Sequence, residues 1–308
     1  MVFRVVIVGG GLVGSLAAVY MAEKGCEVHV FEKRPDLRKE TGSAGKSINL
    51  ALSARGIAAI EKVGLGCELK DNMIPMSGRF IHLSSGKTSV QNYGVFGECI
   101  NSVDRKWVNK MLQDNAELHK NVTLHFCASL ESINFTDNTI MFKEDGKNEV
   151  LKDVTLVIGC DGAYSRVRSL LMRQIRMDYA QEYIDHAYVE LSMPPTSDGE
   201  YAMSANHLHI WPRQTFMMIA LPNLDKSFTV TLFMPWSKFD AIKSEADLLG
   251  FFEGVFPDSI PLLGRDALIK DYFTNEKGSL ISVKCKPYHY ENKVVLLGDA
   301  IHAMVFCI

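Results

Sequence analysis

The chain has 308 residues, of which 47% are hydrophobic and 22% are charged, with a formal net charge of −3 and a pI near 6.3. This composition is typical of a globular protein large enough for two subdomains, and it excludes a disordered or low-complexity chain. A weakly acidic chain has no general attraction to nucleic acid or to anionic lipid, so we expect neither as a partner.

Seven scattered cysteines, none of them in a C-x-x-C pair, favour reduced thiols over a disulfide framework or a zinc site. The apolar start of the chain is too short and too rich in glycine for a signal peptide, and no apolar run is long enough to span a membrane. We therefore expect a soluble chain in a reducing compartment, without a bound metal.

The first 34 residues predict a βαβ unit. "FRVVIVGG" is typical of a buried strand, and "LVGSLAAVYMAEKG" has the apolar spacing of a helix that ends at Gly25. "EVHVFEKR" is the next strand. Two strands joined by one helix within about 30 residues indicate a parallel, doubly wound sheet.

The rest of the chain predicts a second kind of sheet. "GRFIHLSSGKTSVQNYG" has the pattern of a hairpin, and "AYVELSM", "TFMMIALP" and "FTVTLFMP" are typical of antiparallel strands. A helix in "RKWVNKMLQDNAEL" and strands in "VTLHF", "TLVIGCDG" and "NKVVLLGDA" return to the first sheet. The predicted fold is α/β: a Rossmann-like domain interrupted by a domain with a mostly antiparallel β-sheet.

A glycine motif follows the first strand. Gly9, Gly11 and Gly14 have the GxGxxG spacing, in which the first glycine permits a tight turn, the second lets a pyrophosphate approach and the third lets the helix pack on the strand. Glu32 ends the second strand, where an acidic side chain can accept hydrogen bonds from a ribose diol. Together these features predict a dinucleotide site at the start of the first helix.

Two further strand ends favour FAD over NAD. Asp161 follows one strand in "GCDGAYSRVRS", and Asp299 follows another in "LLGDA". A nicotinamide dehydrogenase does not need these segments, whereas an extended FAD must be held along its pyrophosphate and its ribityl chain.

At this point a family resemblance is plain. "GGGLVG", "GCDGAYS" and "GDA" resemble the flavin monooxygenases related to p-hydroxybenzoate hydroxylase. "KSINLALSARG", "HLHIWPR", "FMMIALPN", "SFTVTLFMP" and "ISVKCKPY" are similar to the kynurenine 3-monooxygenases over almost the whole chain. The resemblance implies hydroxylation of L-kynurenine to 3-hydroxykynurenine with FAD, NADPH and O2 by way of a flavin C4a-hydroperoxide.

The resemblance also implies positions that contact the cofactor. Matched by position, the FAD contacts are Val13, Glu32, Arg34, Ala51, Arg105, Leu130, Arg166 and Asp299. The predicted FAD-binding domain comprises residues 1–75, 98–178 and 285–308, and the predicted substrate domain comprises residues 76–97 and 179–284.

The hairpin contains a predicted carboxylate site. If it turns symmetrically about Gly86, then Arg79 faces Tyr93 across the two strands. A guanidinium beside a phenol can bind the carboxylate of an amino acid, and the two positions match the family's carboxylate-binding pair. A surface arginine is the alternative.

An apolar slot for the substrate ring is predicted on the second sheet. Met217, Ile219 and Leu221 share one strand face by the two-residue period, and Leu208 and Phe233 lie on neighbouring strands at positions similar to the family's pocket. Ordinary core packing is the alternative. The amino group of kynurenine already activates its ring, so we assign no catalytic acid or base.

The end of the chain departs from the family pattern. Ile301 stands where the family has alanine, and "VFCI" replaces a segment that the family continues through Pro-Phe-Phe-Gly-Gln-Gly-Met-Asn. We therefore expect impaired hydroxylation by these residues alone. The resemblance implies the cytosolic face of the mitochondrial outer membrane for the whole protein. Another aromatic hydroxylase of this fold, or a flavin-binding relative without turnover, stays an alternative.

Overall fold

The computed structural model describes residues 3–39, 49–144 and 146–305, and they form two compact units. Unit 1 comprises the described parts of 1–42, 106–183 and 281–306, and unit 2 those of 43–105 and 184–280. Each unit has its own sheet and its own hydrophobic core.

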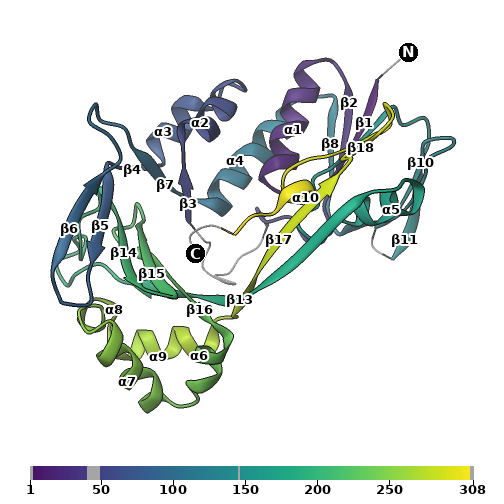
Figure 1. Ribbon diagram of the computed structural model, residues 1–308. Coiled ribbons are helices and arrows are strands. Elements are labelled where there is room, and N and C mark those ends of the chain that lie inside the picture. The colour runs from purple at the N-terminus through teal and green to yellow at the C-terminus, as the bar shows by residue number, and fades with distance from the viewer. Residues whose placement is uncertain (1–2, 40–48, 145, 306–308) are drawn as a thin grey trace. The chain divides into compact units, whose positions relative to one another are not determined.

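Unit 1 is built on a six-stranded sheet with the strand order β18-β19-β12-β1-β2-β8 (Figure 1). Its strands are β1 (Arg4–Val8), β2 (Glu27–Phe31), β8 (Val122–His125), β12 (Leu156–Gly159), β18 (His289–Tyr290) and β19 (Val294–Leu296). All neighbours pair in parallel except β18 and β19, which pair antiparallel. The predicted Rossmann-like sheet is confirmed.

Small residues bring the first helix of unit 1 close to this sheet. Helix α1 (Leu12–Glu23) buries Gly14, Ser15, Ala18, Val19 and Ala22, which recur at helical spacing. The helix ends where Gly25 adopts a φ of +79°, as the sequence predicts. The other helices of the unit are α4 (Arg105–Leu118), α5 (Arg166–Gln174) and α10 (Asp299–His302).

A second, three-stranded antiparallel sheet in unit 1 has the order β11-β10-β9. Its strands are β9 (Ala128–Asn134), β10 (Thr139–Glu144) and β11 (Lys147–Leu151). Ile140 and Phe142 of β10 are fully buried in a core shared with Val6 and Val167. This sheet therefore packs against the large sheet as part of one core.

Most of a seven-stranded sheet with the order β17-β13-β16-β15-β14-β5-β6 lies in unit 2, whereas residues 178–183 of β13 and 281–286 of β17 belong to unit 1. Its strands are β5 (Gly78–His82), β6 (Thr88–Asn92), β13 (Asp178–Met193), β14 (His207–Arg213), β15 (Phe216–Pro222), β16 (Phe228–Pro235) and β17 (Gly278–Lys286). Strands β13, β16, β15 and β14 pair antiparallel, and β14 pairs in parallel with β5. The predicted mostly antiparallel sheet is confirmed.

Helices cover one face of this sheet (Figure 1). They are α6 (Trp236–Ala241), α7 (Glu245–Val255), α8 (Ile260–Leu263) and α9 (Arg265–Thr274). Trp211 of β14, Met218 of β15 and Leu232 of β16 point toward this face and are fully buried in one core with Phe252 and Tyr272. Because side chains alternate along a strand, the residues next to these three on their strands point to the opposite face.

A small sheet with the order β3-β7-β4 packs within unit 2, together with two short helices. The elements are β3 (Asn49–Leu52), α2 (Ala54–Glu61), α3 (Gly66–Asp71), β4 (Ile74–Met76) and β7 (Ile100–Asp104). Asn49 donates hydrogen bonds to the Ser102 hydroxyl and to the Pro222 carbonyl of β15, at 3.0 and 3.2 Å. By packing, residues 49–75 and 98–105 therefore lie with unit 2, although we assigned them to the FAD-binding domain. The functional boundaries of the two domains stay a prediction.

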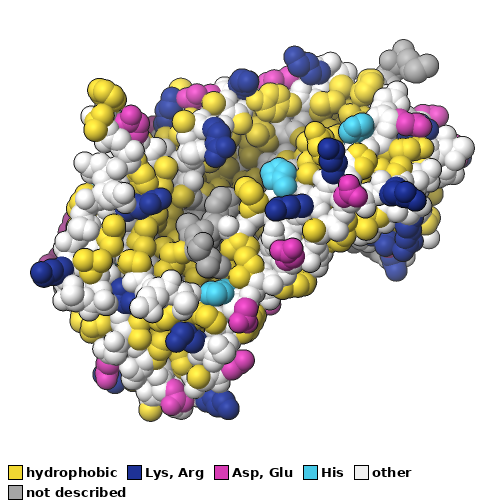
Figure 2. All heavy atoms as spheres, viewed as in Figure 1, with side chains coloured by type: hydrophobic (Ala, Val, Ile, Leu, Met, Phe, Trp, Pro, Cys, Tyr) yellow, Lys and Arg dark blue, Asp and Glu magenta, His cyan; other side chains and the backbone are white. Residues whose placement is uncertain are grey.

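Charged side chains on the face shown in Figure 2 are scattered, with no single large patch of either sign. Over the described ranges, no helix combines the length and the apolar character that crossing a membrane requires. No group of three metal-ligating side chains is found within the same ranges.

A buried polar cluster joins β5 and β14 to the segment after α7. His82 Nε2 lies 3.0 Å from His209 Nδ1, and His82 Nδ1 lies 3.0 Å from the Asp258 carboxylate, to which the Trp211 indole also donates. His209 Nε2 donates to the Ser204 carbonyl at 2.9 Å, because a carbonyl can only accept. Hydrogen bonds between side chains therefore tie β5 and β14 to each other and to Asp258.

We predict that Gly14→Ala lowers the free energy of unfolding by about 1–3 kcal/mol, since a methyl group there collides with the Gly9 carbonyl. Gly11→Ala is the matched control, because no atom of the described residues lies within 4 Å of the position that its methyl group would take. It should cost at most about 1 kcal/mol, the effect of alanine at a helix N-cap. Urea unfolding of both variants measures the difference, and equal losses would contradict the close packing of Gly14.

The second prediction concerns stability at acidic pH. Burial lowers the pKa of His209 to about 4, and positive charge on His82 and His207 acts in the same direction. The unfolded chain binds a proton near the ordinary pKa of about 6.5, so the contribution of His209 is present above that pH and is lost as the pH falls toward 4. The free energy of unfolding should fall in this window by up to about 1.4 kcal/mol per pH unit for this proton. His209→Gln should flatten the slope, whereas His289→Gln, at an exposed position, should leave it unchanged.

Candidate functional site

The glycine turn between β1 and α1 has the three features that the motif predicts. Gly9 has a φ of +103°, and a Cβ on it would collide with the Cys160 carbonyl at the end of β12. A Cβ on Gly14 would collide with the Gly9 carbonyl, whereas Gly11 faces open space among the described residues. Gly11 also gives α1 no side-chain cap, so the N–H groups of the first turn are left for a ligand.

Glu32 clamps this turn from the end of β2. Its Oε2 accepts a hydrogen bond from the Gly10 N–H at 2.8 Å, and its Oε1 accepts from the backbone N–H and the Nε of Arg34 at 3.0 and 2.8 Å. Burial favours a higher pKa for Glu32, but these hydrogen bonds outweigh it and hold the pKa below its ordinary value. The carboxylate is therefore ionised at neutral pH, with Arg34 as its counter-ion.

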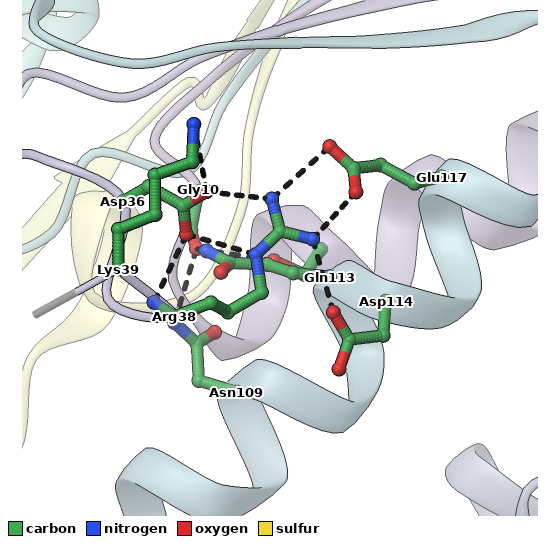
Figure 3. Close-up of polar contacts among 9 residues, drawn as sticks. Gly10, Asp36, Arg38, Lys39, Asn109, Gln113, Asp114 and Glu117 are labelled. Atoms are coloured by element: carbon green, nitrogen blue, oxygen red, sulfur yellow. Dashed lines mark hydrogen bonds and ion pairs between the residues drawn. The ribbon is translucent and has the colours of Figure 1, made fainter.

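Three side chains donate hydrogen bonds to the Gly10 carbonyl, and two of them, Asn109 and Gln113, come from α4 (Figure 3). The Gly10 carbonyl accepts hydrogen bonds from Ser15 Oγ at 3.0 Å, Gln113 Nε2 at 2.8 Å and Asn109 Nδ2 at 3.3 Å. Sequence reasoning missed the two amides. Their four-residue spacing on α4, on the buried side of the helix, is the signal that could have found them.

An arginine holds the same helix beside the segment that follows β2 (Figure 3). Arg38 donates to the carboxylates of Asp36, Asp114 and Glu117 at 2.6–3.0 Å. The hydrogen bonds from Arg38 lower the pKa of the buried Asp36 carboxyl. This network fixes α4 next to the glycine turn.

Asp161 has a local structural role. Its carboxylate accepts hydrogen bonds from Ser165 Oγ and the Arg166 N–H, both at 2.6 Å, and from the Val167 N–H at 3.1 Å. It therefore caps the start of α5. The guanidinium of Arg166 is exposed and donates to the Glu131 carbonyl at 3.0 Å. A direct contact of either side chain with FAD stays a prediction.

Two of the predicted FAD segments meet in unit 1. A Cβ on Gly298 would lie 3.0 Å from Val13 Cγ2, so the "GDA" segment touches the glycine turn. Asp299, the first residue of α10, is exposed beside this contact. The buried Arg168 holds the segment by donating to the Ala300 carbonyl at 2.8 Å.

The remaining predicted FAD contacts differ in exposure. Leu130 is buried in the core of unit 1, so only its backbone can face a ligand. Ala51 in β3 and Arg105 at the start of α4 are exposed. Both belong to unit 2, and their contact with FAD stays a prediction.

The residues of unit 1 fit the pyrophosphate end of FAD. The observation that decides this is the open side of Gly11, framed by two glycines that accept no side chain and by uncapped N–H groups. A buried, ionised carboxylate at the end of β2 completes the set of groups that such a site needs.

The predicted register of the hairpin in unit 2 is wrong by two residues. Arg79 pairs with Gln91 and not with Tyr93, because the loop has three residues, Ser84 to Gly86, and only Gly86 has a positive φ, +77°. That loop is centred on Ser85. Arg79 and Tyr93 nevertheless meet diagonally, with the guanidinium carbon 5.6 Å from the centre of the ring.

The five predicted ring contacts share the face of the large sheet that the helices do not cover. Strand pairing places Leu208 directly beside Arg79 and Met217 directly beside Phe233. Met217, Ile219, Leu208 and Phe233 are partly buried, and Leu221 is 5% exposed. The sheet therefore carries an exposed cation next to an apolar surface. These positions are not part of the core beneath the helices, and their contact with a substrate ring stays a prediction.

A cavity of about 210 Å³ opens at one end of this surface. Met217 and Phe233 line it together with Phe216 and Pro212 at the turn between β14 and β15. Its wall is predominantly apolar, as a site for an aromatic ring requires.

Comparison with known proteins gives the family. The model of the family described as "FAD binding domain" matches residues 3–306. Kynurenine 3-monooxygenases of Anopheles gambiae and Drosophila willistoni are each 48% identical over 98% of this chain, which covers 62% and 67% of their lengths. The enzyme of that name from Sus scrofa is 45% identical, again over 98% of this chain and 64% of its own length. The chain thus spans about two thirds of the curated relatives that it matches.

Solved structures show the same fold. The tetrameric form of 2-methyl-3-hydroxypyridine-5-carboxylic acid oxygenase superimposes with a TM-score of 0.77 at 20% identity, covering 98% of this chain and 76% of that one. PqsL from Pseudomonas aeruginosa, a probable FAD-dependent monooxygenase, gives 0.76 at 19% identity, covering 98% and 80%. From the glycine turn, the matched domain and the relatives, the chain belongs to the kynurenine 3-monooxygenase family of FAD-binding proteins.

Proposed function

We propose that the whole protein hydroxylates L-kynurenine to 3-hydroxykynurenine with FAD, NADPH and O2. The observation that supports this most is the 45–48% identity to kynurenine 3-monooxygenases over 98% of the chain. The pairing of a cation with an apolar surface in unit 2 supports the same substrate, which has a carboxylate at one end and an aromatic ketone at the other.

The first step is to hold the cofactor. The N–H groups at Gly11 and in the first turn of α1 would bind the pyrophosphate. The Glu32 carboxylate would accept from a ribose hydroxyl in place of its longest hydrogen bond, the 3.4 Å contact from Arg34 Nη2. Bound FAD supplies the activation of O2 after reduction by NADPH. The chain contributes position and a fixed electrostatic environment.

Arg79 binds the substrate carboxylate. Its guanidinium is exposed and has a planar set of donors that suits a carboxylate. The ring of Tyr93 lies beside it and limits its movement. From Arg79 on β5 to Leu221 on β15 the distance is two strand spacings, about 10 Å, which an extended amino acid side chain can span.

The apolar surface orients the aromatic ring. Met217, Ile219 and Phe233 offer no hydrogen bond to the ring, so its position is set by shape and by exclusion of water. The substrate amino group already makes the neighbouring ring carbon electron-rich. A strong general base from the protein is therefore unnecessary.

For the whole protein we further infer the location of the resembled family, the cytosolic face of the mitochondrial outer membrane. Only the family resemblance supports this location. Fractionation of cells that express the protein with an epitope tag tests it, and recovery away from mitochondria would contradict it.

We predict that Gly11→Ala weakens FAD binding by about 10- to 150-fold. The added methyl group occupies the open side of the turn without disturbing the described residues. It therefore keeps the phosphate away from the backbone N–H groups, and the expected factor is the effect of losing hydrogen bonds to a charged group. Titration of the apoprotein with FAD measures the effect. Gly250→Ala, at a similarly open position in α7, should bind FAD like the wild type, and unchanged binding by Gly11→Ala would place the pyrophosphate elsewhere.

The second prediction is that Arg79→Met raises the KM for kynurenine by about 10- to 150-fold, because a charge-assisted contact with the carboxylate is lost. The KM for NADPH should change far less. Steady-state kinetics of the whole protein measure both constants. Lys87→Met, on the same hairpin, is the control for loss of one positive charge, and a larger effect on NADPH than on kynurenine would assign Arg79 to the nicotinamide path.

A further inference from the structure

The Gly10 residue is held at both of its polar atoms. Its N–H donates to Glu32, and its carbonyl accepts from Ser15, Asn109 and Gln113 at 2.8–3.3 Å. A carbonyl oxygen has two lone pairs, so three donors exceed what it needs for satisfaction. The orientation of this carbonyl is therefore strongly determined.

The orientation of the Gly10 carbonyl sets the direction of the next N–H group. The peptide bond between Gly10 and Gly11 is trans, and across a planar trans peptide the C=O and the following N–H point in opposite directions. Because the carbonyl points toward α4, the Gly11 N–H points away from it. That is the direction in which an anion can approach the turn.

The two amides are unusual residues for a buried helix face. Asn109 is 6% exposed and Gln113 is 1% exposed. Their side-chain oxygens, Oδ1 and Oε1, have no hydrogen-bond partner among the described residues. Buried polar atoms without partners destabilise a fold, so the contribution of these amides to stability does not explain their presence.

We propose that Asn109 and Gln113 are positioning residues for the FAD pyrophosphate, acting through the Gly10 carbonyl to aim the Gly11 N–H at the phosphate. This role rests on the FAD site described above. Helix α4 can perform it because Arg38 anchors the next turns of the same helix through Asp114 and Glu117 (Figure 3). The donors are neutral, so they order the turn without adding charge.

The test is the double variant Asn109→Leu with Gln113→Met, which removes both donors and keeps apolar volume. Titration of the apoprotein should show FAD bound at least 10-fold more weakly, which corresponds to about 1.4 kcal/mol. ADP, which has the same pyrophosphate, should weaken by a similar factor. Without any ligand, backbone hydrogen exchange of residues 9–16 should become faster than in the wild type. If the double variant does not fold, Gln113→Met alone is measured in the same way.

Asn121→Leu is the matched control. Its amide also donates to two backbone carbonyls, those of Ala22 and Cys26, at 2.9 and 2.7 Å, but at the far end of α1. It should lower stability and leave FAD affinity within two-fold of the wild type. Equal FAD affinity in the wild type and the folded double variant would overturn the positioning role alone. Equal weakening in Asn121→Leu would also overturn it, since the loss would then follow stability. A wild-type chain that binds no FAD would overturn the proposed function as well.

Discussion

The close approach of three backbones at the end of β1 is the constraint on which unit 1 depends. Gly9 touches the Cys160 carbonyl of β12, and Gly14 touches the carbonyl of Gly9, so β1, β12 and α1 meet without a side chain between them. This contact places the start of α1 at the carboxyl ends of the parallel strands. Ligands of open α/β sheets bind at that edge, because helix N-termini and strand ends converge there.

The charges around the turn follow from this packing. A turn made of glycines contributes no basic side chain of its own, so what it offers to an anion is its backbone N–H groups. A buried carboxylate next to such a site would repel the phosphates if it were unpaired. Glu32 avoids this because Arg34 neutralises it, and its hydrogen bond to Gly10 gives it a structural role as well. The site thus combines backbone N–H groups that can bind an anion with a carboxylate, Glu32, whose charge Arg34 neutralises.

The sequence predicts the parts of the fold that periodicity and glycine determine, and it fails where a specific contact decides. The βαβ unit and the two kinds of sheet follow from apolar spacing. The three-stranded sheet of β9, β10 and β11 was not predicted, and in β11 the residues Lys147 to Val150 are all exposed and show no alternation. The hairpin register was wrong because the same residues, Ser84 to Lys87, are compatible with a turn centred on Gly86 and with the observed three-residue loop centred on Ser85. Asn109 and Gln113 have the polarity of a solvated helix face, so their four-residue spacing only suggests a shared face, and their packing establishes that this face is buried.

In unit 2, the register between β5 and β14 decides whether Arg79 can act as a substrate clamp. No tight turn sets this register, because the two strands are far apart in the sequence and pair in parallel. The polar cluster sets it: His82 stacks on Trp211 at 4.0 Å and bonds to His209, while Asp258 binds both His82 and Trp211. A slip of one residue would turn His82 to the opposite face and Arg79 into the helix-covered core. Buried polar contacts on one face of the sheet therefore hold the cation beside Leu208 on the other.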